Sequence, residues 1–586
     1  MSYKWHASAT SEGRNGTVAV APLAGAPFLA LESCISRQGI TPFVARHVKK
    51  LYLPIASFAK LRDAESDWSF EVDPVLEKQI QSMAGNTVNH KRAVQALKNI
   101  NTTDVDNLLR DFPDRDRLDR HQIQAVAALS HPDIQGMCLF DEQGLGKTIM
   151  ALFAFHRLHG DGAVGRMVVV CPKNVAFEWA HDAERFFGTQ YRVSVVVGNE
   201  REKRKLLSTR SDIYITNFET VSSLNISLRQ LLEAERGRGL LVIDESYFVK
   251  NKDARRTQAV RRLRDAAGRC FVLCGTPAPN APSDLVEQFN IADGGQTFSG
   301  VQVPDDHGSA TEVVRNAVVE RGLYLRRLKD HVLQLPERTF HKIVVPLQPE
   351  QNKAYRATLG ELIGALRSVD EVSFKKNLAS FAARRMALLQ ICSNPSSVVS
   401  EYSETPAKVL ALDSLLEELV SKKGEKVVLW SYFTASLSKI FDRFARFNPV
   451  RLDGSVTDTS LRRAAIRQFQ EDSTTMLFVA NPAAAAAGIT LHRARYSIYE
   501  SLSNQAAHFL QSLDRIHRRG QLRPVEYFFL LAENSIEIDE FHRLEAKQQS
   551  AQKLLGDRAK PTMTRLSMLK EALNAAHAIG MDNYAS

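Results

Sequence analysis

The chain has 586 residues, of which 44% are hydrophobic and 24% charged, so its length indicates several globular domains rather than one core. Its formal net charge of +10 favours an anionic partner, because lysine and arginine attract phosphates. No apolar run reaches the length of a membrane span, and the six cysteines form neither a Cys-x-x-Cys pair nor a zinc-type cluster. We therefore expect a soluble, cytoplasmic protein with reduced thiols.

Residues 1–110 contain strand-like and helical stretches, including a helical pattern over 74–83, but no recognisable motif. We interpret them as a small N-terminal accessory domain. Two roles stay open for it at this point: packing against the rest of the chain, or recognition of a protein partner.

Residues 111–295 alternate between apolar strand-like runs and amphipathic helical patterns, which is typical of a parallel sheet covered by helices. The strand-like runs cover residues 137–140, 167–171, 193–197, 213–216, 240–243 and 270–274. A second block of this kind covers residues 401–545, with strand-like runs at 426–430, 475–479, 496–499 and 525–531. The sequence thus predicts an α/β protein with two parallel sheets flanked by helices.

The remaining segments are mainly helical. Residues 296–400 form a predicted helical linker with one strand-like run at 342–347, and only helical patterns occur from 546 to 586. The expected organisation is therefore an accessory domain, two α/β blocks joined by a helical region, and C-terminal helices.

A glycine-containing loop follows the first strand-like run and precedes a helix. It reads Asp141-Glu142-Gln143-Gly144-Leu145-Gly146-Lys147-Thr148. Strand, glycine loop and helix form a phosphate cradle, in which Lys147 reaches the β- and γ-phosphates and Thr148 holds Mg²⁺. The strict pattern has glycine where Asp141 stands, so an ordinary strand-to-helix turn is the alternative.

Two carboxylates follow the run at 240–243, where ligands bind in such sheets. Asp244 is suited to ligate Mg²⁺ through water, and Glu245 to orient and deprotonate the attacking water. The alternative, a helix-capping pair, does not explain why they follow a phosphate loop at a distance of one domain.

A third candidate segment, 511–521, lies in the second block. On a helix, Gln511, Arg515 and Arg518 would share one face, and two arginines there suit the charge that develops on the γ-phosphate. Taken alone, a solvated basic helix face is the simpler interpretation. Together with the first two motifs, the segment predicts that the nucleotide binds between the two blocks.

These motifs, in this order over about residues 115–545, resemble superfamily-two helicases and more closely their Swi/Snf-type branch of double-stranded-DNA translocases. The resemblance implies two RecA-like lobes at 111–295 and 401–545, with ATP and Mg²⁺ as cofactors. Asp141 occupies a position where that branch carries aspartate. The helices after residue 546 resemble a brace that such motors fold back on the first lobe.

The resemblance adds further residues to the ATP site. Gln122 looks like the adenine-reading glutamine, and Gly488 belongs to a segment similar to motif V. Arg515 and Arg518 fall on the arginine-finger positions. The expected ATP-binding set is Gln122, Gly144, Leu145, Gly146, Lys147, Thr148 and Gly488, with Lys147, Glu245, Arg515 and Arg518 catalytic and Thr148 and Asp244 on the metal.

DNA would lie across both lobes and be held by its phosphates, so little sequence specificity and strong salt dependence are implied. The candidate contacts come from strand ends that face the groove between the lobes in the family. They are Lys173, Thr216, Thr276, Ser431 and Thr490.

The sequence departs from the family pattern at coupling positions. Tyr247 replaces the histidine of the Asp-Glu-Ala-His box, Ala485 and Ala486 replace glycines, and 504–506 replaces Trp-Asn-Pro. These changes concern translocation rather than hydrolysis. No bromo-, chromo- or SANT-like module is recognisable, which favours a compact bacterial or phage form.

The leading hypothesis is a monomeric, DNA-stimulated ATPase that translocates on duplex DNA and remodels DNA or protein–DNA complexes. The segment Leu325-Arg326-Arg327 favours it over a strand-separating helicase. A nucleotide-dependent DNA-binding scaffold is the third hypothesis, and the intact catalytic residues argue against it.

Overall fold

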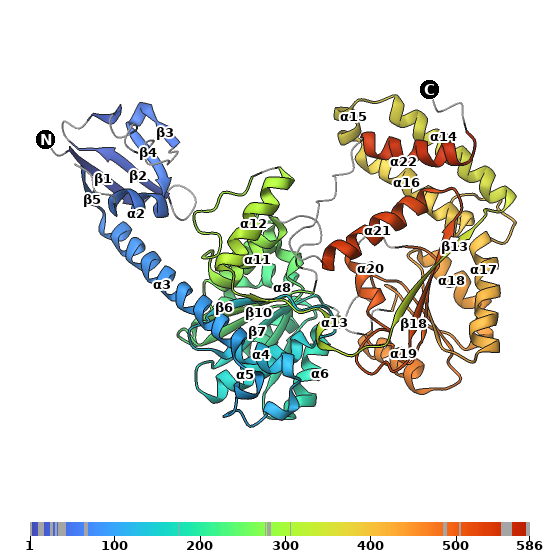
Figure 1. The fold of residues 1–586 in the computed structure, drawn as a ribbon, viewed down its shortest axis with the longest axis horizontal. Coiled ribbons are helices and arrows are strands. Elements are labelled where there is room, and N and C mark those ends of the chain that lie inside the picture. The colour runs from blue at the N-terminus through green and yellow to red at the C-terminus, as the bar shows by residue number, and fades with distance from the viewer. Residues whose placement is uncertain are drawn as a thin grey trace. The chain divides into compact units, whose positions relative to one another are not determined.

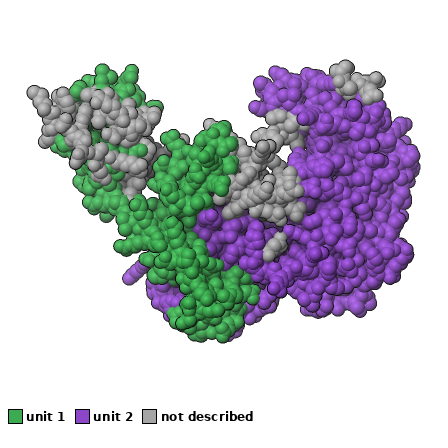
Figure 2. Space-filling model, in the orientation of Figure 1, with its two compact units in different colours: residues 1–137, 289–323 green, residues 138–288, 324–586 purple. Residues whose placement is uncertain are grey.

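The computed structural model folds into two compact units, residues 1–137 with 289–323 and residues 138–288 with 324–586 (Figure 2). They contain sheets of five, seven and six strands. Among the described residues, no helix combines the length and apolarity needed to cross a membrane. The structure describes residues 3–9, 17–23, 27–29, 32, 35, 43–63, 68–173, 175–275, 277, 283–304, 306–456, 458–484, 489–502, 506–552 and 565–581.

The first unit begins with a five-stranded sheet in the order β3-β4-β2-β1-β5, antiparallel except for the parallel pair β1 and β5. Apolar side chains from its strands and helices, such as Trp5 and Phe58, form its core. The strands are β1 (Tyr3–Ala9), β2 (Thr17–Pro22), β3 (Phe43–Ala45), β4 (Lys50–Pro54) and β5 (Trp68–Val72), and α2 (Ile55–Asp63) follows β4.

A long helix, α3 (Pro74–Thr102), leaves this sheet, as Figure 1 shows in blue. It starts at a proline in the first turn, and the Asp73 side chain accepts a hydrogen bond from the Val75 amide at 2.7 Å. The helix is much longer than the predicted 74–83. The rest of the first unit includes α4 (Arg120–Ser130) and α12 (His307–Arg321), and α11 (Ser283–Asp293) crosses the boundary between the units.

The seven-stranded sheet has the order β12-β6-β11-β10-β7-β9-β8. The pairs β12–β6, β11–β10, β10–β7, β7–β9 and β9–β8 are parallel. Both faces of the central strands are buried, which explains their continuous apolar sequences. The strands are β6 (Gly136–Leu139), β7 (Arg166–Cys171), β8 (Val193–Val196), β9 (Ile213–Asn217), β10 (Gly239–Ile243), β11 (Arg269–Leu273) and β12 (Tyr324–Leu325). The connecting helices are α5 (Lys147–Gly160), α6 (Ala176–Phe187), α7 (Glu200–Ser208), α8 (Phe218–Ser223), α9 (Asn225–Glu233) and α10 (Arg255–Arg264).

The six-stranded sheet is also parallel, in the order β13-β18-β17-β14-β16-β15. Its strands are β13 (Arg338–Val345), β14 (Val427–Trp430), β15 (Val450–Leu452), β16 (Leu477–Ala480), β17 (Tyr496–Tyr499) and β18 (Val525–Ala532). Helices around it include α13 (Lys329–Val332), α17 (Ala407–Leu416), α18 (Thr434–Arg443), α19 (Thr459–Glu471), α20 (Ala506–Leu513) and α21 (Ile536–Gln552). The predicted α/β fold with two parallel sheets is confirmed.

The sheets extend beyond the predicted lobe boundaries. β12 joins the first sheet and β13 the second, although both lie inside the predicted linker 296–400. β13 runs beside β18 over eight residue pairs (Figure 1). It is an edge strand with a mixed burial pattern, so its sequence lacks the continuous apolar run that marks the central strands.

The described C-terminal helix, α22 (Arg565–Ala578), packs with α14 (Pro349–Arg367) and α16 (Leu378–Ser393) in one apolar cluster. Its residues Met568 and Ala572 are fully buried there. Residues 565–578 thus pack against the helical region, and the brace on the first lobe stays a prediction. The apolar face of α22 fits the helices of the linker because both bury their hydrophobic sides together. The short helix α15 (Glu371–Lys376) lies between α14 and α16 in the chain.

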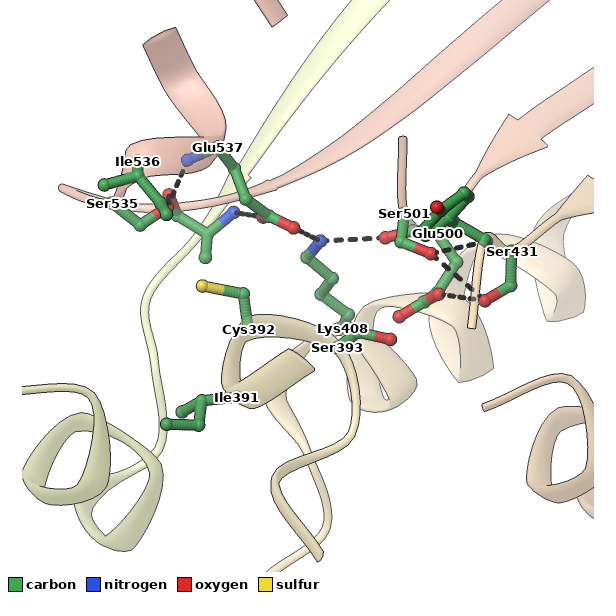
Figure 3. A network of polar contacts seen from close by, with 12 residues as sticks. Ile391, Cys392, Ser393, Lys408, Ser431, Glu500, Ser501, Ser535, Ile536 and Glu537 are labelled. Carbon is green, nitrogen blue, oxygen red and sulfur yellow. Dashed lines mark hydrogen bonds and ion pairs between the residues drawn. The ribbon is translucent and has the colours of Figure 1, made fainter. Parts of the chain in front are cut away.

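A buried ionic network holds the carboxyl ends of the second sheet (Figure 3). Lys408 Nζ donates to Glu537 Oε1 at 2.7 Å and to the Glu500 carbonyl at 2.8 Å, and Ser431 Oγ donates to Glu500 Oε2 at 2.7 Å. Burial alone would lower the pKa of Lys408, but the carboxylates of Glu537 and Glu500 outweigh it and the pKa is raised. The lysine therefore stays charged and ties α17, β17 and α21 together.

Candidate active site

The phosphate loop between β6 and α5 has the backbone that a phosphate cradle needs. Gly144 and Gly146 have φ angles of +91° and +86°, a left-handed region that favours glycine. Lys147 begins α5, and its ammonium donates to the carbonyls of Asp141 at 2.9 Å and Glu142 at 3.4 Å. The ammonium thus lies over the loop, where a phosphate would be held.

A third glycine closes on the loop from the end of β11. A Cβ atom added to Gly275 would clash with the amide oxygen of Gln143 and would lie 3.3 Å from both the Gln143 amide nitrogen and Lys147 Nζ. A larger residue here would therefore displace the Gln143 side chain. The next residue, Thr276, lies outside the described residues.

Asp141 is fully buried and paired with Arg327. Its Oδ1 accepts from the Arg327 amide at 3.0 Å, and both carboxylate oxygens accept from Arg327 Nε at 3.1 Å. Arg326 donates from Nη1 to the Gly275 carbonyl at 2.9 Å and to the Phe140 carbonyl. The two arginines therefore fix the segment after β12 to the base of the phosphate loop.

The two carboxylates after β10 lie beside the loop. Asp244 accepts from Trp179 Nε1 at 2.8 Å and from the Glu245 amide at 2.9 Å. Glu245 Oε1 accepts from Gln143 Nε2 at 3.2 Å, while its buried Oε2 has no hydrogen-bond partner among the described residues. Such an orphaned acceptor is suited to an incoming water molecule.

Burial, and secondarily the charge of Asp244, raises the pKa of Glu245 to about 7. Burial also raises the pKa of Asp244. A carboxyl group with a pKa near the working pH is well matched to a general base. The hard oxygen donors of Thr148 and Asp244 fit Mg²⁺, which binds few protein groups and keeps water and substrate phosphates as further ligands.

The arginine segment differs from its predicted form. Helix α20 ends at Leu513, so Arg515 and Arg518 lie in the turns that follow rather than on one helix face with Gln511. Arg515 and Arg518 donate to the Ile489 carbonyl at 3.2 and 2.9 Å. These bonds hold the turn against the segment at Ile489, a contact that the helical spacing of the arginines does not predict.

Arg518 nevertheless lies against the phosphate loop, and Arg515 lies near Glu245. Arg518 Nε lies 3.6 Å from the position of a Cβ atom at Gly144. The pKa of Arg515 is lowered to about 10 by burial, and the carboxylate of Glu245 acts in the opposite direction, which reflects their proximity. Arg515 is therefore a buried cation close to the proposed base.

Tyr247 also connects the two sheets. Gln511 donates a side-chain hydrogen bond to it, although burial is the main influence on Tyr247 and raises its pKa. The tyrosine that replaces the box histidine thus links the carboxylate strand to the arginine segment.

Two predicted ATP contacts stay predictions. Gln122 belongs to the first unit, where its Oε1 accepts from the Asp119 amide at 3.1 Å and closes a capping box at the start of α4. Gly488 lies outside the described residues, as do Ala485, Ala486 and positions 504–505.

The predicted DNA contacts do not form one exposed set. Lys173 is exposed after β7, and the half-buried Thr490 accepts from Arg518 through its hydroxyl at 3.0 Å. Thr216 and Ser431 are fully buried. The Thr216 hydroxyl donates to the Val196 carbonyl at 3.2 Å, and the Ser431 hydroxyl donates to Glu500 Oε2 at 2.7 Å. The side chains of Thr216 and Ser431 thus donate to internal acceptors, and their contact with DNA stays a prediction.

Sequence reasoning missed four residues that contact the site: Trp179, Arg327, Lys329 and Asp514. In the sequence analysis Arg327 appears only within the segment Leu325-Arg326-Arg327, and Lys329 lies two positions after it. That short spacing is the one signal that could have indicated Lys329. The partners of both residues lie more than 180 positions away along the chain.

Residues 121–397 match the model of the SNF2-related domain, and residues 407–520 match that of the helicase conserved C-terminal domain. A Xenopus tropicalis protein, SWI/SNF-related matrix-associated actin-dependent regulator of chromatin subfamily A-like protein 1, is 26% identical over 421 residues, which are 68% of this chain and 41% of that protein. The Saccharomyces cerevisiae ISWI chromatin-remodeling complex ATPase ISW1 is 26% identical over 452 residues, 71% of this chain and 38% of that protein.

The chain spans less than half the length of these curated relatives. Among solved structures, the Sulfolobus solfataricus SWI2/SNF2 ATPase core in complex with dsDNA aligns with 75% of this chain and 97% of that chain, at 20% identity and a TM-score of 0.33. The phosphate loop and the paired carboxylates lie within the first matched segment and the two arginines within the second, and over both segments the chain is similar to ATPases of the SWI/SNF family.

Proposed function

We propose that the protein is a DNA-stimulated ATPase that moves along double-stranded DNA and remodels DNA or protein–DNA complexes. One observation carries the proposal: Arg518 from the second sheet lies against Gly144 of the phosphate loop on the first. A nucleotide held there would touch both sheets. Its hydrolysis would release one sheet from the other, and such a cycle is the basis of a motor.

The proposed chemistry uses residues from both sheets. Lys147 and the loop amides bind the β- and γ-phosphates, and Glu245 accepts a proton from the attacking water. Arg515 and Arg518 stabilise the charge on the phosphoryl oxygens. Thr148 and Asp244 would hold Mg²⁺, which when bound neutralises phosphate charge.

Duplex DNA as substrate is supported by the match to chromatin-remodelling ATPases and by the net charge of +10. We infer phosphate contacts from Lys173, which is exposed, and from Thr490 and Thr276. Thr490 accepts a hydrogen bond from Arg518, so a DNA contact there would connect directly to the ATP site. Such contacts position the duplex without reading its sequence.

The test compares ATP turnover without DNA, with single-stranded DNA and with duplex DNA. We expect the highest rate with duplex, displacement of a triplex-forming strand, and no separation of a forked duplex. Absence of stimulation by duplex contradicts the proposal, and unwinding of the fork favours a strand-separating helicase instead. Lys147→Ala and Glu245→Gln are the controls, which should lose turnover and keep DNA binding.

We also infer that residues 1–110 bind a protein partner and that the motor acts as a monomer. Phe43, on the edge strand β3, is 73% exposed, and an exposed large apolar residue on a sheet edge supports an interaction there. A pull-down that compares the full chain with Phe43→Ser would test the partner, and light scattering would test the monomer. The bacterial or phage origin stays a prediction.

A further inference from the structure

Lys329 is a buried lysine that joins the phosphate loop to the arginine segment. Its backbone amide donates to Glu142 Oε2 at 2.7 Å, and its ammonium donates to Asp514 Oδ1 at 2.6 Å. The Lys329 side chain is 2% exposed and that of Asp514 is 14% exposed. Glu142 lies in the phosphate loop and Asp514 directly precedes Arg515, so one residue contacts both halves of the site.

The ammonium of Lys329 also lies over the phosphate cradle. A Cβ atom at Gly144 would be 3.2 Å from Lys329 Cε and 3.5 Å from its Nζ, beside Arg518 Nε at 3.6 Å. The cationic side chains of Lys329 and Arg518 thus both lie beside Gly144. Their positive charges repel each other, and an anion bound between them would offset this repulsion.

The charge balance around Lys329 points the same way. Burial lowers its pKa and Arg518 adds to this effect, while the carboxylates of Asp514 and Glu142 raise it. An ammonium group carries three donor hydrogens, so a phosphate oxygen at the loop would compete with Asp514 for it. A nucleoside triphosphate brings a terminal phosphate that a diphosphate lacks.

We propose that Lys329 contacts the terminal phosphate of ATP and exchanges Asp514 for that phosphate when the loop is filled. The inference rests on the proposed ATP site. The exchange would release the carboxylate that neighbours Arg515, so the arginine segment would respond to the presence of the terminal phosphate. Lys329 would then be a second phosphate-binding lysine beside Lys147.

The test is a fluorescence titration of a labelled, slowly hydrolysed ATP analogue and of labelled ADP, without DNA, on the full chain. We expect Lys329→Met to weaken binding of the triphosphate about tenfold, the size of one charge-assisted hydrogen bond, and to leave ADP within about twofold. Asp514→Asn should bind the triphosphate at least as well as the unsubstituted chain, because it removes the competing carboxylate.

Lys342→Met is the matched control, since Lys342 forms an ion pair with Glu545 at 3.3 Å and is 42% exposed. It should change neither affinity. An equal loss for both nucleotides in Lys329→Met, or weaker triphosphate binding in Asp514→Asn, would overturn the proposal, because the pair would then only hold the loop in shape. Failure of the unsubstituted chain to bind either nucleotide would instead contradict the ATP site itself.

Discussion

A fully buried ion pair anchors the phosphate loop at the residue scale. Asp141 has no exposed surface and receives hydrogen bonds from both the backbone and the side chain of Arg327. A glycine here, as in the general loop pattern, would leave the guanidinium without its carboxylate. The loop therefore depends on a segment that lies 186 residues after Asp141 in the chain.

Asp141→Ala is expected to lower the free energy of unfolding by about 3–5 kcal/mol, because it leaves a largely buried arginine unpaired. Denaturation by urea, followed by tryptophan fluorescence, measures the loss. Asp413→Ala is the matched control: its pair with Arg443 is 30% and 41% exposed and should contribute less than about 1 kcal/mol. An equal loss of unfolding free energy for the two substitutions would show that the buried Asp141 pair stabilises the fold no more than an exposed pair.

The ATPase rate is expected to depend on pH through Glu245. Its pKa is about 7, and only the ionised carboxylate can accept a proton, so kcat/KM should rise as the pH increases through 7. Below that pH the carboxyl group is protonated and the rate falls. The measurement is the ATPase rate from pH 5.5 to 8.5 at constant ionic strength. A flat profile would contradict the role of Glu245 as the base.

The same shift has a defined sign for stability. The folded pKa of Glu245 lies above the ordinary glutamate value of 4.5, so the folded state binds this proton more tightly than the unfolded chain. Its contribution to stability is therefore lost as the pH rises from about 4.5 to about 7. Activity at this position thus comes at some cost in stability, as is common at catalytic groups.

At the element scale, the turn after α20 brings the arginines to the loop. The bonds from Arg515 and Arg518 to the Ile489 carbonyl hold this turn against the segment that precedes β17. Since α20 ends at Leu513, these bonds rather than helical hydrogen bonds hold the two arginines in place.

Arg518→Ala is expected to reduce kcat by about three orders of magnitude, as loss of an arginine finger does, while nucleotide affinity changes far less. A kinetic comparison of kcat and KM, together with the melting temperature, separates catalysis from folding. Arg519→Ala, at the neighbouring position, serves as the control. A rise in KM with kcat retained would instead show that Arg518 contributes only to binding of ATP in the ground state.

At the scale of the whole molecule, residues that follow strands of the two parallel sheets meet at the proposed nucleotide site. The phosphate loop and Glu245 come from the seven-stranded sheet, and the arginine segment from the six-stranded one. Lys329 and Tyr247 add contacts between them. Turnover that opens these contacts would move the two sheets apart, and this is the movement required by the proposed motor.

The duplex-stimulated part of the ATPase rate is expected to fall steeply with salt, because phosphate contacts release counterions. The rate without DNA should change little between 50 and 200 mM salt, a range over which strongly electrostatic DNA binding weakens by roughly 10³-fold or more. Titrations of duplex DNA at several salt concentrations measure the slope. A salt-independent affinity would contradict a phosphate-dominated interface, and Lys173→Ala should reduce the slope by about one contact.

The phosphate loop, the carboxylate pair and the parallel sheets could be predicted because each depends on the pattern of a short stretch of sequence. Apolar runs specify buried parallel strands, and a strand followed by Gly144 and Gly146 specifies the loop. The edge strand β13 was only partly detected, since a half-exposed strand carries a weak apolar signal. The hydroxyls of Thr216 and Ser431 have the same sequence context whether they face a groove or a neighbouring carbonyl.

The sequence by itself thus determined the two α/β blocks and indicated the residue types of the proposed ATP site, because local patterns fix strands, loops and phosphate-binding side chains. Only the tertiary structure decided which distant residues meet. Asp141 pairs with Arg327 and Lys329 with Asp514 across about 185 positions. Which residues pair depends on how the chain folds back on itself. Their burial matters because a buried charge without a partner is strongly destabilising.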